Sequence, residues 1–140
     1  MPSVVEAETP MKAPVKNGLV PYLNVDGALA AADFYKQAFG AVVAAQQPVD
    51  DKGRTMHVHL YINGSSLMLG DFYPEHGHGK VAAQGYSLAL DVKDIEAAFR
   101  RAVDAGCEVT TPVQKMFWGD IYGSVKDPFG VHWALNQPVE

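Results

Sequence analysis

The hydrophobic positions of the chain change their spacing several times, and these changes predict alternating strands and helices. The short apolar run Leu19–Val25 predicts a strand, and the Ala-rich stretch Ala28–Phe39, with its aromatic residues on one side, predicts a helix that Gly40 ends. Three further strands are predicted over Ala41–Val49, Thr55–Ile62 and Ser66–Phe72, and Asn63-Gly64 between the last two is typical of a type I′ hairpin turn.

The second half of the chain repeats this order of elements. Its predicted elements are a strand over Tyr86–Val92, a helix over Asp94–Ala105, and strands over Glu108–Val113, Asp120–Lys126 and Val131–Asn136. Identical residues recur at one spacing in Gly40/Gly106, Val43/Val109, Gly53/Gly119, Gly64/Gly130 and Leu69/Leu135. We therefore predict an α+β fold of two βαβββ modules, about residues 17–75 and 83–138, within one domain over residues 17–138. Residues 1–16 are expected to be an N-terminal tail that packs on a neighbour or stays mobile.

Each predicted strand has one aliphatic face and one face of small or polar residues, which we call the semi-polar face. The aliphatic faces, which include Leu19, Met56 and Trp133, are expected to lie under the helices. The semi-polar faces collect Val20, Tyr22, Asn24, His57, His59, Ser66, Met68, Ser87, Ala89, His132 and Ala134. Two such faces opposite each other would enclose a concave cavity, where small ligands usually bind.

The composition is that of a folded protein, and it excludes several functional classes. Of 140 residues, 48% are hydrophobic and 19% are charged. The net charge is −5 without any cluster of Lys and Arg, so we predict no nucleic-acid partner. No apolar run could span a bilayer, the N-terminus lacks the pattern of a secretory signal, and the single cysteine, Cys107, fits a reducing compartment. A cytoplasmic protein without a membrane partner is expected.

Several short motifs of the chain match the pattern of one known group of proteins. The motifs are Val20-Pro21-Tyr22-Leu23, Phe34-Tyr35-Lys36-Gln37-Ala38-Phe39-Gly40, Asn63-Gly64-Ser65-Ser66-Leu67-Met68-Leu69, Asp94-Ile95-Glu96-Ala97-Ala98, Phe117-Trp118-Gly119-Asp120 and Asp127-Pro128-Phe129-Gly130. Together they resemble the vicinal oxygen chelate superfamily, which includes glyoxalase I, the bleomycin-resistance proteins and the extradiol dioxygenases. The last two motifs resemble its PhnB-like branch. The resemblance implies a cupped mixed sheet with helices on the outer face, usually in a homodimer.

The resemblance also implies where a metal would bind, and this chain has no metal ligands there. Metal-dependent members use His, Gln or Glu on the first and last strands of both modules, which here correspond to Val20, Met68, Ser87 and Ala134. None of these residues offers an imidazole, a carboxylate or a thiolate. The sequence therefore predicts neither a metal at the family positions nor any other cofactor.

Three histidines leave a displaced metal site open. His57 and His59 alternate along one strand and so share a face, and His132 lies on the last strand. They could hold a divalent metal, act as acid–base groups, or line a wet cavity through hydrogen bonds. Asp71 would add a carboxylate only by turning against the alternation of its strand.

Other candidate residues point less specifically to a function. The stretch Phe117–Tyr122 holds three aromatic side chains that could stack on a flat ligand or pack at a dimer seam. The pair His76 and His78 is expected to lie in a solvated loop, because glycines surround it. Cys107 lacks a nearby basic residue that would lower its pKa, so a structural role is expected.

Two functions follow from these observations. The first is a glyoxalase/bleomycin-resistance-like protein that binds a small planar or amphipathic molecule in a concave cavity without the usual family metal. The alternative is a divalent-metal-dependent lyase, isomerase or dioxygenase that uses the displaced histidine site, so whether the chain is an enzyme stays open. The predicted partners are a small molecule and a second copy of the chain. The predicted ligand-binding residues are Tyr22, His57, His59, Phe117, Trp118, Tyr122 and His132.

Overall fold

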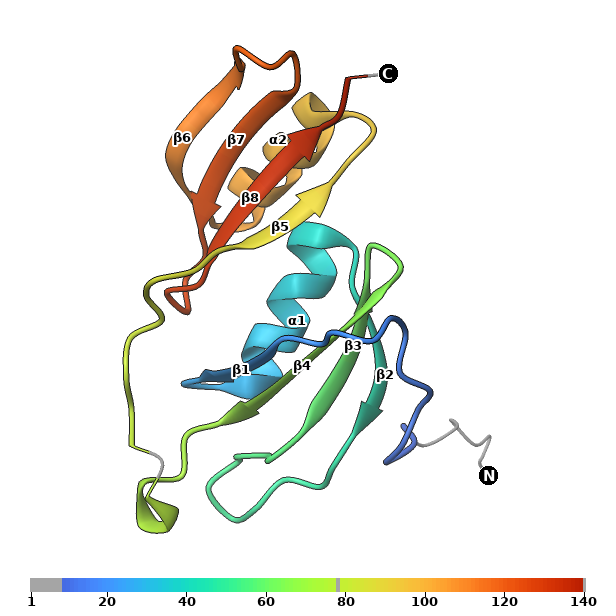
Figure 1. Ribbon diagram of the computed structural model, residues 1–140. Coiled ribbons are helices and arrows are strands. Elements are labelled where there is room, and N and C mark those ends of the chain that lie inside the picture. Colours follow the sequence, from blue (N-terminus) through green and yellow to red (C-terminus); the bar gives the residue numbers. More distant parts are fainter. Residues whose placement is uncertain (1–8, 78, 140) are drawn as a thin grey trace.

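The chain folds as two consecutive modules with the same order of elements (Figure 1). The computed structural model describes residues 9–77 and 79–139. The first module contains β1 (Tyr22–Val25), α1 (Ala28–Phe39), β2 (Val42–Gln46), β3 (Val58–Ile62) and β4 (Ser65–Asp71). A short 3-10 helix, Pro74–His76, follows β4. The second module contains β5 (Leu88–Asp91), α2 (Ile95–Ala105), β6 (Glu108–Lys115), β7 (Ile121–Lys126) and β8 (His132–Gln137).

Each module forms its own mixed sheet of four strands, and the two sheets have matching topology. Their strand orders are β1-β4-β3-β2 and β5-β8-β7-β6. The pairs β1–β4 and β5–β8 are parallel, and the other neighbours are antiparallel. Asn63 and Gly64 both have positive φ angles, 52° and 81°, as a type I′ turn between β3 and β4 requires. The predicted α+β fold of two βαβββ modules is confirmed.

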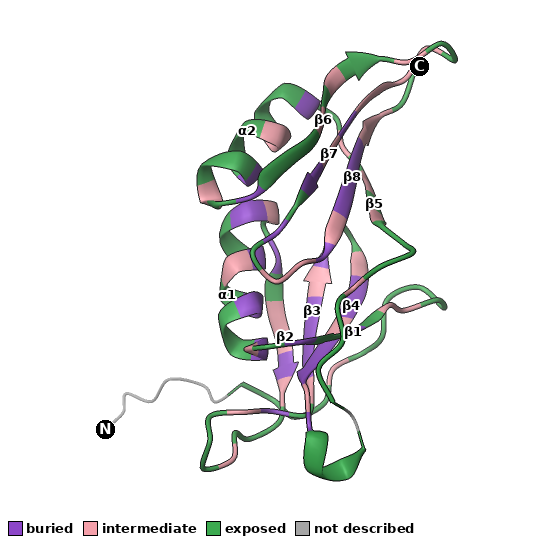
Figure 2. Cartoon of the chain, turned by 90° about the vertical axis from the view of Figure 1, so that its left-hand side faces the viewer, coloured by how far each residue is buried: buried purple, intermediate pink, exposed green. Residues whose placement is uncertain are grey.

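Both helices lie on one side of the two sheets. In Figure 2, α1 and α2 stack along one edge of the molecule while the strands of both sheets lie on the other. The helices contact each other and the aliphatic faces of their sheets. The core therefore continues from one module into the next, and Trp133 of β8 packs against Tyr35 and Phe39 of α1, with ring centroids 5.2 and 4.4 Å apart. Trp133 is buried, as predicted.

A buried carboxylate joins the modules within this core. Asp127, in the turn between β7 and β8, accepts hydrogen bonds at Oδ2 from the Tyr35 hydroxyl (2.5 Å) and the Trp133 indole N–H (2.9 Å). Its Oδ1 accepts from the backbone N–H groups of Phe129 and Val131. The charge of Asp127 and burial raise the pKa of the Tyr35 hydroxyl, with burial the larger cause. Four donors thus satisfy one buried charge, as buried charges require.

Two strands begin later than their hydrophobic pattern predicts, and two residues expected in the core are exposed. Leu19 is 90% exposed and Met56 is 52% exposed. The ladder of β1 begins at Tyr22 because Pro21 has no N–H to donate. Just before β3, the carbonyl of Met56 accepts a hydrogen bond from the hydroxyl of Tyr22, and the pairing of β3 with β4 starts only at Val58. The prediction of Leu19 and Met56 as core residues is wrong for these reasons.

The segment before β1 lies across the first sheet. Residues 10–17 contact β2, β3 and β4 through hydrogen bonds, and in Figure 1 the blue segment crosses in front of this sheet. Residues 1–8 of the predicted tail and His78 of the predicted loop pair lie outside the described residues. None of the described helices is long and apolar enough to cross a membrane.

Candidate functional site

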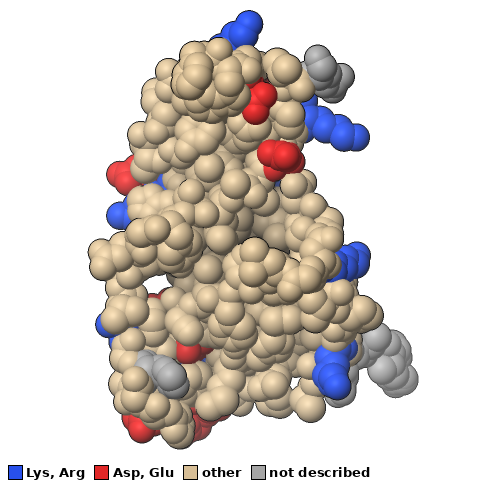
Figure 3. Space-filling view, in the orientation of Figure 1, with Lys and Arg blue, Asp and Glu red and all other residues tan. Residues whose placement is uncertain are grey.

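The semi-polar faces of both sheets point to the same side of the molecule, away from the helices (Figures 1 and 2). They lie side by side within one chain, so they do not close on each other. Figure 3 views this side and shows mostly uncharged surface, with the charged side chains largely along its rim. Large side chains are exposed here or at its ends, among them Leu19, Tyr22, Met56, Phe117 and Trp118. An open, charge-poor face of this kind is typical of a binding surface.

A pocket of about 360 Å³ lies at the end of the first sheet. It is lined by Tyr22, Asn24, Met56, Gly70, Asp71, Tyr73 and His76. Tyr22 stands between this pocket and His57, with the two ring centroids 5.8 Å apart. This volume is within the range of small-molecule sites. The pocket is therefore our candidate site in the first module.

Tyr22 is a neutral group in this pocket. Its hydroxyl donates a hydrogen bond to the carbonyl of Met56. Burial, and secondly the neighbouring Tyr73, raise the pKa of the Tyr22 hydroxyl. The hydrogen bond to Met56 holds the hydroxyl proton, and the raised pKa keeps the hydroxyl neutral. Tyr22 can therefore stack on a ligand or accept a hydrogen bond from one. It is unsuited to act as a base.

A second pocket of about 480 Å³ occupies the matching place in the second module. It is lined by Asp91, Val92, Lys93, Gly119, Ile121, Gln137, Pro138 and Val139. Gln137 and Val139 correspond to Asp71 and Tyr73 of the first pocket at the spacing of the internal repeat. The two pockets thus share corresponding lining positions at the end of the last strand of each module. We favour the smaller one as the candidate site because its tyrosines and histidine offer both stacking and hydrogen bonds.

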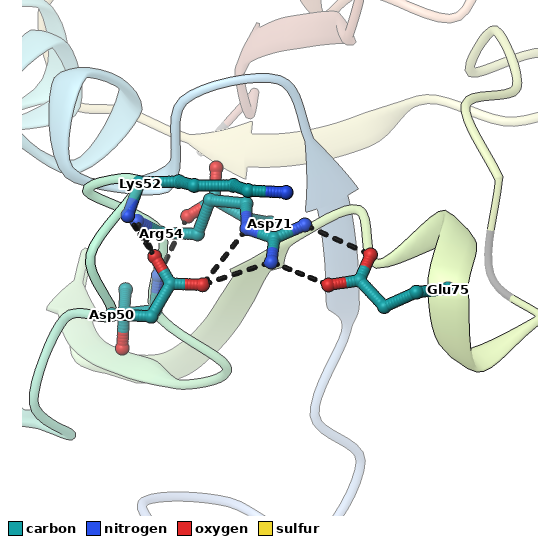
Figure 4. A network of polar contacts seen from close by, with 6 residues as sticks. Asp50, Lys52, Arg54, Asp71 and Glu75 are labelled. Atoms are coloured by element: carbon teal, nitrogen blue, oxygen red, sulfur yellow. Dashed lines mark hydrogen bonds and ion pairs between the residues drawn. The ribbon is translucent and has the colours of Figure 1, made fainter.

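An ion-pair network borders the first pocket (Figure 4). The guanidinium of Arg54 donates to both carboxylate oxygens of Glu75, at 3.0 and 2.5 Å, and through Nε to Asp50 at 2.9 Å. It also lies 4.3 Å from the centre of the Tyr73 ring. The hydrogen bonds from Arg54 lower the pKa of Glu75 to about 2. This network holds the loop before β3 against the 3-10 helix and so shapes one wall of the pocket.

His59 is the most buried of the predicted site residues. It is 1% exposed, and its Nε2 lies 2.7 Å from the hydroxyl of Ser66, which is 2% exposed. Burial, and secondly the neighbouring His57, lower the pKa of His59. A lowered pKa keeps the imidazole neutral near pH 7. His57, 6.4 Å away between ring centroids, is half-buried.

The aromatic candidates lie far from these histidines, in the second module. Phe117 and Trp118 form the turn between β6 and β7, with rings perpendicular at 4.8 Å and with 97% and 50% of their surfaces exposed. Tyr122 pairs with Asn136 near one end of β8, while His132 pairs with Lys126 at its other end. The structure therefore brings Tyr22, His57 and His59 together, and places the other four predicted residues along the neighbouring sheet.

Neither candidate metal site has a suitable set of ligands. At the family positions, Val20, Met68, Ser87 and Ala134 carry no imidazole or carboxylate, and His59, which pairs with Met68, has its Nε2 at the Ser66 hydroxyl. Across residues 9–77 and 79–139, no three His, Cys, Asp or Glu side chains are grouped so that they could hold a metal ion. Asp71 does not turn inward, because its carboxylate accepts from the backbone N–H groups of Gly27, Ala28 and Thr55 at 2.9–3.0 Å. The residues that the structure describes therefore do not fit a metal centre.

The sequence analysis missed several residues of the first pocket. Gly70 and Tyr73 line it without having been singled out, and so do Asn24, which was expected on the semi-polar face but not as a ligand-binding residue, and Met56, which was expected under the helices. Gly70 carried a usable signal, since a glycine inside a strand often marks a close approach of other atoms. A Cβ at this position would collide with the carbonyl of Met56 and lie 3.2 Å from the Tyr22 hydroxyl. The contacts of residues 10–17 gave no comparable signal.

Comparison with known proteins agrees with this fold. An uncharacterized protein of Mycobacterium bovis is 43% identical over 131 residues, which span 89% of this chain and 86% of that protein. A Pseudomonas aeruginosa protein of known structure aligns with a TM-score of 0.71 at 29% identity, over 87% of this chain and 98% of the other. The PhnB protein from Bacillus cereus aligns with a TM-score of 0.64 at 19% identity, over 87% and 100% of the two chains.

A family model matches most of the chain. The model describes the Glyoxalase/Bleomycin resistance protein/Dioxygenase superfamily, and the match extends over residues 18–135, from the segment before β1 into β8. The region includes the whole first module, most of the second module and every residue that lines the first pocket. This chain therefore belongs to the Glyoxalase/Bleomycin resistance protein/Dioxygenase superfamily.

Proposed function

We propose that this protein binds a small planar or amphipathic molecule without a metal ion, in a cavity that two copies of the chain form together. The observation that carries this proposal is the pocket of about 360 Å³ beside Tyr22 and His57, which opens on a charge-poor face. Its phenol and imidazole rings suit a flat ligand with a polar edge. The PhnB-like branch, supported by Trp118-Gly119-Asp120 and Asp127-Pro128-Phe129-Gly130, and a cytoplasmic location are part of the same proposal.

A second copy completes the cavity in this account. Because the two semi-polar faces lie side by side in one chain, only another molecule can place a face opposite each of them. A twofold axis would do this for both sheets at once, so that the second module of one copy covers the first module of the other. Phe117 and Trp118, 97% and 50% exposed, would then be buried against the partner or the ligand.

The metal-dependent alternative has less support. It needs three ligands around one point, and the described histidines do not supply them: His57 and His59 lie on the first sheet, while His132 begins β8 of the second. His59 already shares its Nε2 with Ser66. We therefore assign the histidines to hydrogen bonding and stacking.

The proposal is tested by fluorescence titration with anilinonaphthalene sulfonate, a planar amphipathic dye, in the presence of EDTA. We expect micromolar binding to the unaltered protein, and about tenfold weaker binding to Tyr22→Ala and His57→Ala, which corresponds to about 1.4 kcal/mol each. Val81→Ala is the matched control, because Val81 is 75% exposed and lies outside both pockets. Equal affinity in all four proteins, or binding that EDTA abolishes, would contradict the proposal.

A further inference from the structure

Residues 10–17, which we call the strap, cross the semi-polar face of the first sheet and are bound to three of its strands. The carbonyl of Pro10 accepts from the N–H of Gln46 in β2 at 2.8 Å, and the carbonyl of Pro14 accepts from the Tyr61 hydroxyl in β3 at 2.6 Å. At β4, the N–H of Lys16 donates to the Ser66 hydroxyl at 2.8 Å, and the N–H of Ser66 donates to the carbonyl of Lys16 at 3.1 Å.

Side chains add to this attachment. The ammonium group of Lys16 lies 4.0 Å from the centre of the Tyr61 ring, within the range of a cation–π contact. The side-chain amide of Asn17 donates to the Ser65 hydroxyl at 2.5 Å. Pro10 and Pro14 fix φ at two positions, so the strap loses less conformational entropy on docking than an ordinary segment would.

The strap accounts for the burial of His59 and Ser66. The second sheet provides an internal comparison for the burial of these two residues. The pair Ser124 and Ala134 in the second sheet corresponds to the pair His59 and Met68 in the first sheet. Ser124 and His132, at the positions that match His59 and Ser66, are half-buried, whereas His59 and Ser66 are 1% and 2% exposed. Within residues 9–77 and 79–139, the same fold therefore leaves these positions more accessible in the sheet that the strap does not cross.

The strap also places new side chains on this face. Met11 and Val15 are 59% and 54% exposed although the backbone around them is docked. Their exposure shows that they do not pack into the sheet beneath. Two apolar side chains thus stand at the surface where a histidine and a serine would otherwise be.

We propose that the strap is a fixed wall of the ligand cavity: it separates His59 and Ser66 from the ligand and presents Met11 and Val15 in their place. The inference rests on the proposed function for its ligand, a planar or amphipathic molecule. It makes the first-sheet side of the cavity apolar and limits the polar contacts of a ligand there to the Tyr22 and His57 end. Met11 and Val15 then become specificity-determining residues.

The shielding of His59 by the strap is tested without a ligand. Histidines of the full chain are carbethoxylated, and the modified peptides are identified by mass spectrometry. We expect His57 to react and His59 to be protected in the unaltered protein. Tyr61→Phe removes the bond to Pro14, and the double variant Tyr61→Phe/Ser65→Ala removes two anchors without touching the Ser66 hydroxyl beside His59, so His59 should react about tenfold faster in the double variant. Tyr86→Phe, at an exposed tyrosine outside the strap contacts, is the control. Reaction of His59 as fast as His57 in the unaltered protein would overturn the proposal.

Hydrogen exchange separates a fixed wall from a cover that a ligand displaces. The amides of Gln46 and Ser66 donate to the strap, so their exchange reports its docking. Saturating anilinonaphthalene sulfonate should leave both amides protected, and Val15→Asp should weaken dye binding about fivefold without exposing them. Faster exchange on dye binding would show displacement and overturn the proposal. Absence of dye binding would contradict the proposed function alone, and the reactivity of His59 would then decide whether the strap closes the site.

Discussion

Asp127 is the residue through which the two modules depend on each other. Its carboxylate accepts from four donors, one of them the hydroxyl of Tyr35 in the other module. Asp127→Asn would turn an N–H₂ group toward donors that need an acceptor, and we expect a loss of about 3 kcal/mol in the free energy of unfolding. Urea denaturation measures this loss, with Asp104→Asn, at an exposed helix position, as the control. An unchanged midpoint would show that the buried carboxylate contributes little to stability.

His59 gives the stability of the protein a dependence on pH. Its folded pKa lies below the ordinary 6.5 because of burial and, secondly, the neighbouring His57, and Lys16 over the adjacent Tyr61 ring is a further cation near it. The unfolded chain then binds more protons, so stability is complete above pH 6.5 and falls as the pH drops below it. Glu75 acts in a separate window, as its contribution is lost between pH 4.5 and about 2.

The histidine window can be isolated by substitution. Thermal melts between pH 7.5 and 5 should show a falling midpoint in the unaltered protein and a flatter dependence in His59→Gln. The same slope in both proteins would assign the effect to another group.

At the scale of elements, both helices begin on side chains supplied by the last strand of their module. Asp71 accepts from the N–H groups of Gly27 and Ala28 at the start of α1, and Gln137 accepts from Ile95 at the start of α2. Helix α2 has its own cap in Asp94, whereas the N-cap of α1 is Gly27 and has no side chain.

This difference predicts unequal losses on substitution. Asp71→Ala should lower the free energy of unfolding by about 2–3 kcal/mol, because three backbone donors lose a charged acceptor. Gln137→Ala should cost about 1 kcal/mol, since Asp94 still caps the helix. Chemical denaturation of the two variants checks the order, and a larger loss for Gln137→Ala would contradict this account of the two helix starts.

The sequence predicted those elements whose signals are local. Helix Ala28–Phe39 was predicted with the observed bounds, because its apolar side and Gly40 mark it directly. The type I′ turn at Asn63-Gly64 was equally local. The late starts of β1 and β3 were missed because Pro21 and the hydroxyl of Tyr22 act on the ladder in ways that hydrophobic alternation does not record.

The candidate site was predictable only in part, for a related reason. Tyr22, His57 and His59 share a face by strand alternation, and the structure does bring them together. The strap was not foreseen because it binds through main-chain carbonyls, which carry no sequence signature, to strands about 36 to 50 residues away.

At the scale of the whole molecule, the exposed face predicts self-association. Phe117 is 97% exposed at the tip of the second module, and Leu19 is 90% exposed in the first. Sedimentation velocity should therefore give a dimer at micromolar concentration. Phe117→Asp should shift the protein toward monomer, whereas Val81→Asp, 75% exposed in the linker between the modules, should not. A monomer at all concentrations would contradict a cavity shared by two copies.

The central claim is that a planar molecule binds beside Tyr22 and His57 without metal. Two-dimensional proton–nitrogen NMR of labelled protein, titrated with anilinonaphthalene sulfonate in EDTA, tests it most directly. We predict saturating shifts of the amides of Tyr22, His57 and Gly70 and of the Trp118 indole, with the buried Trp133 indole unmoved. Shifts confined to other parts of the chain, or none up to millimolar dye, would contradict it.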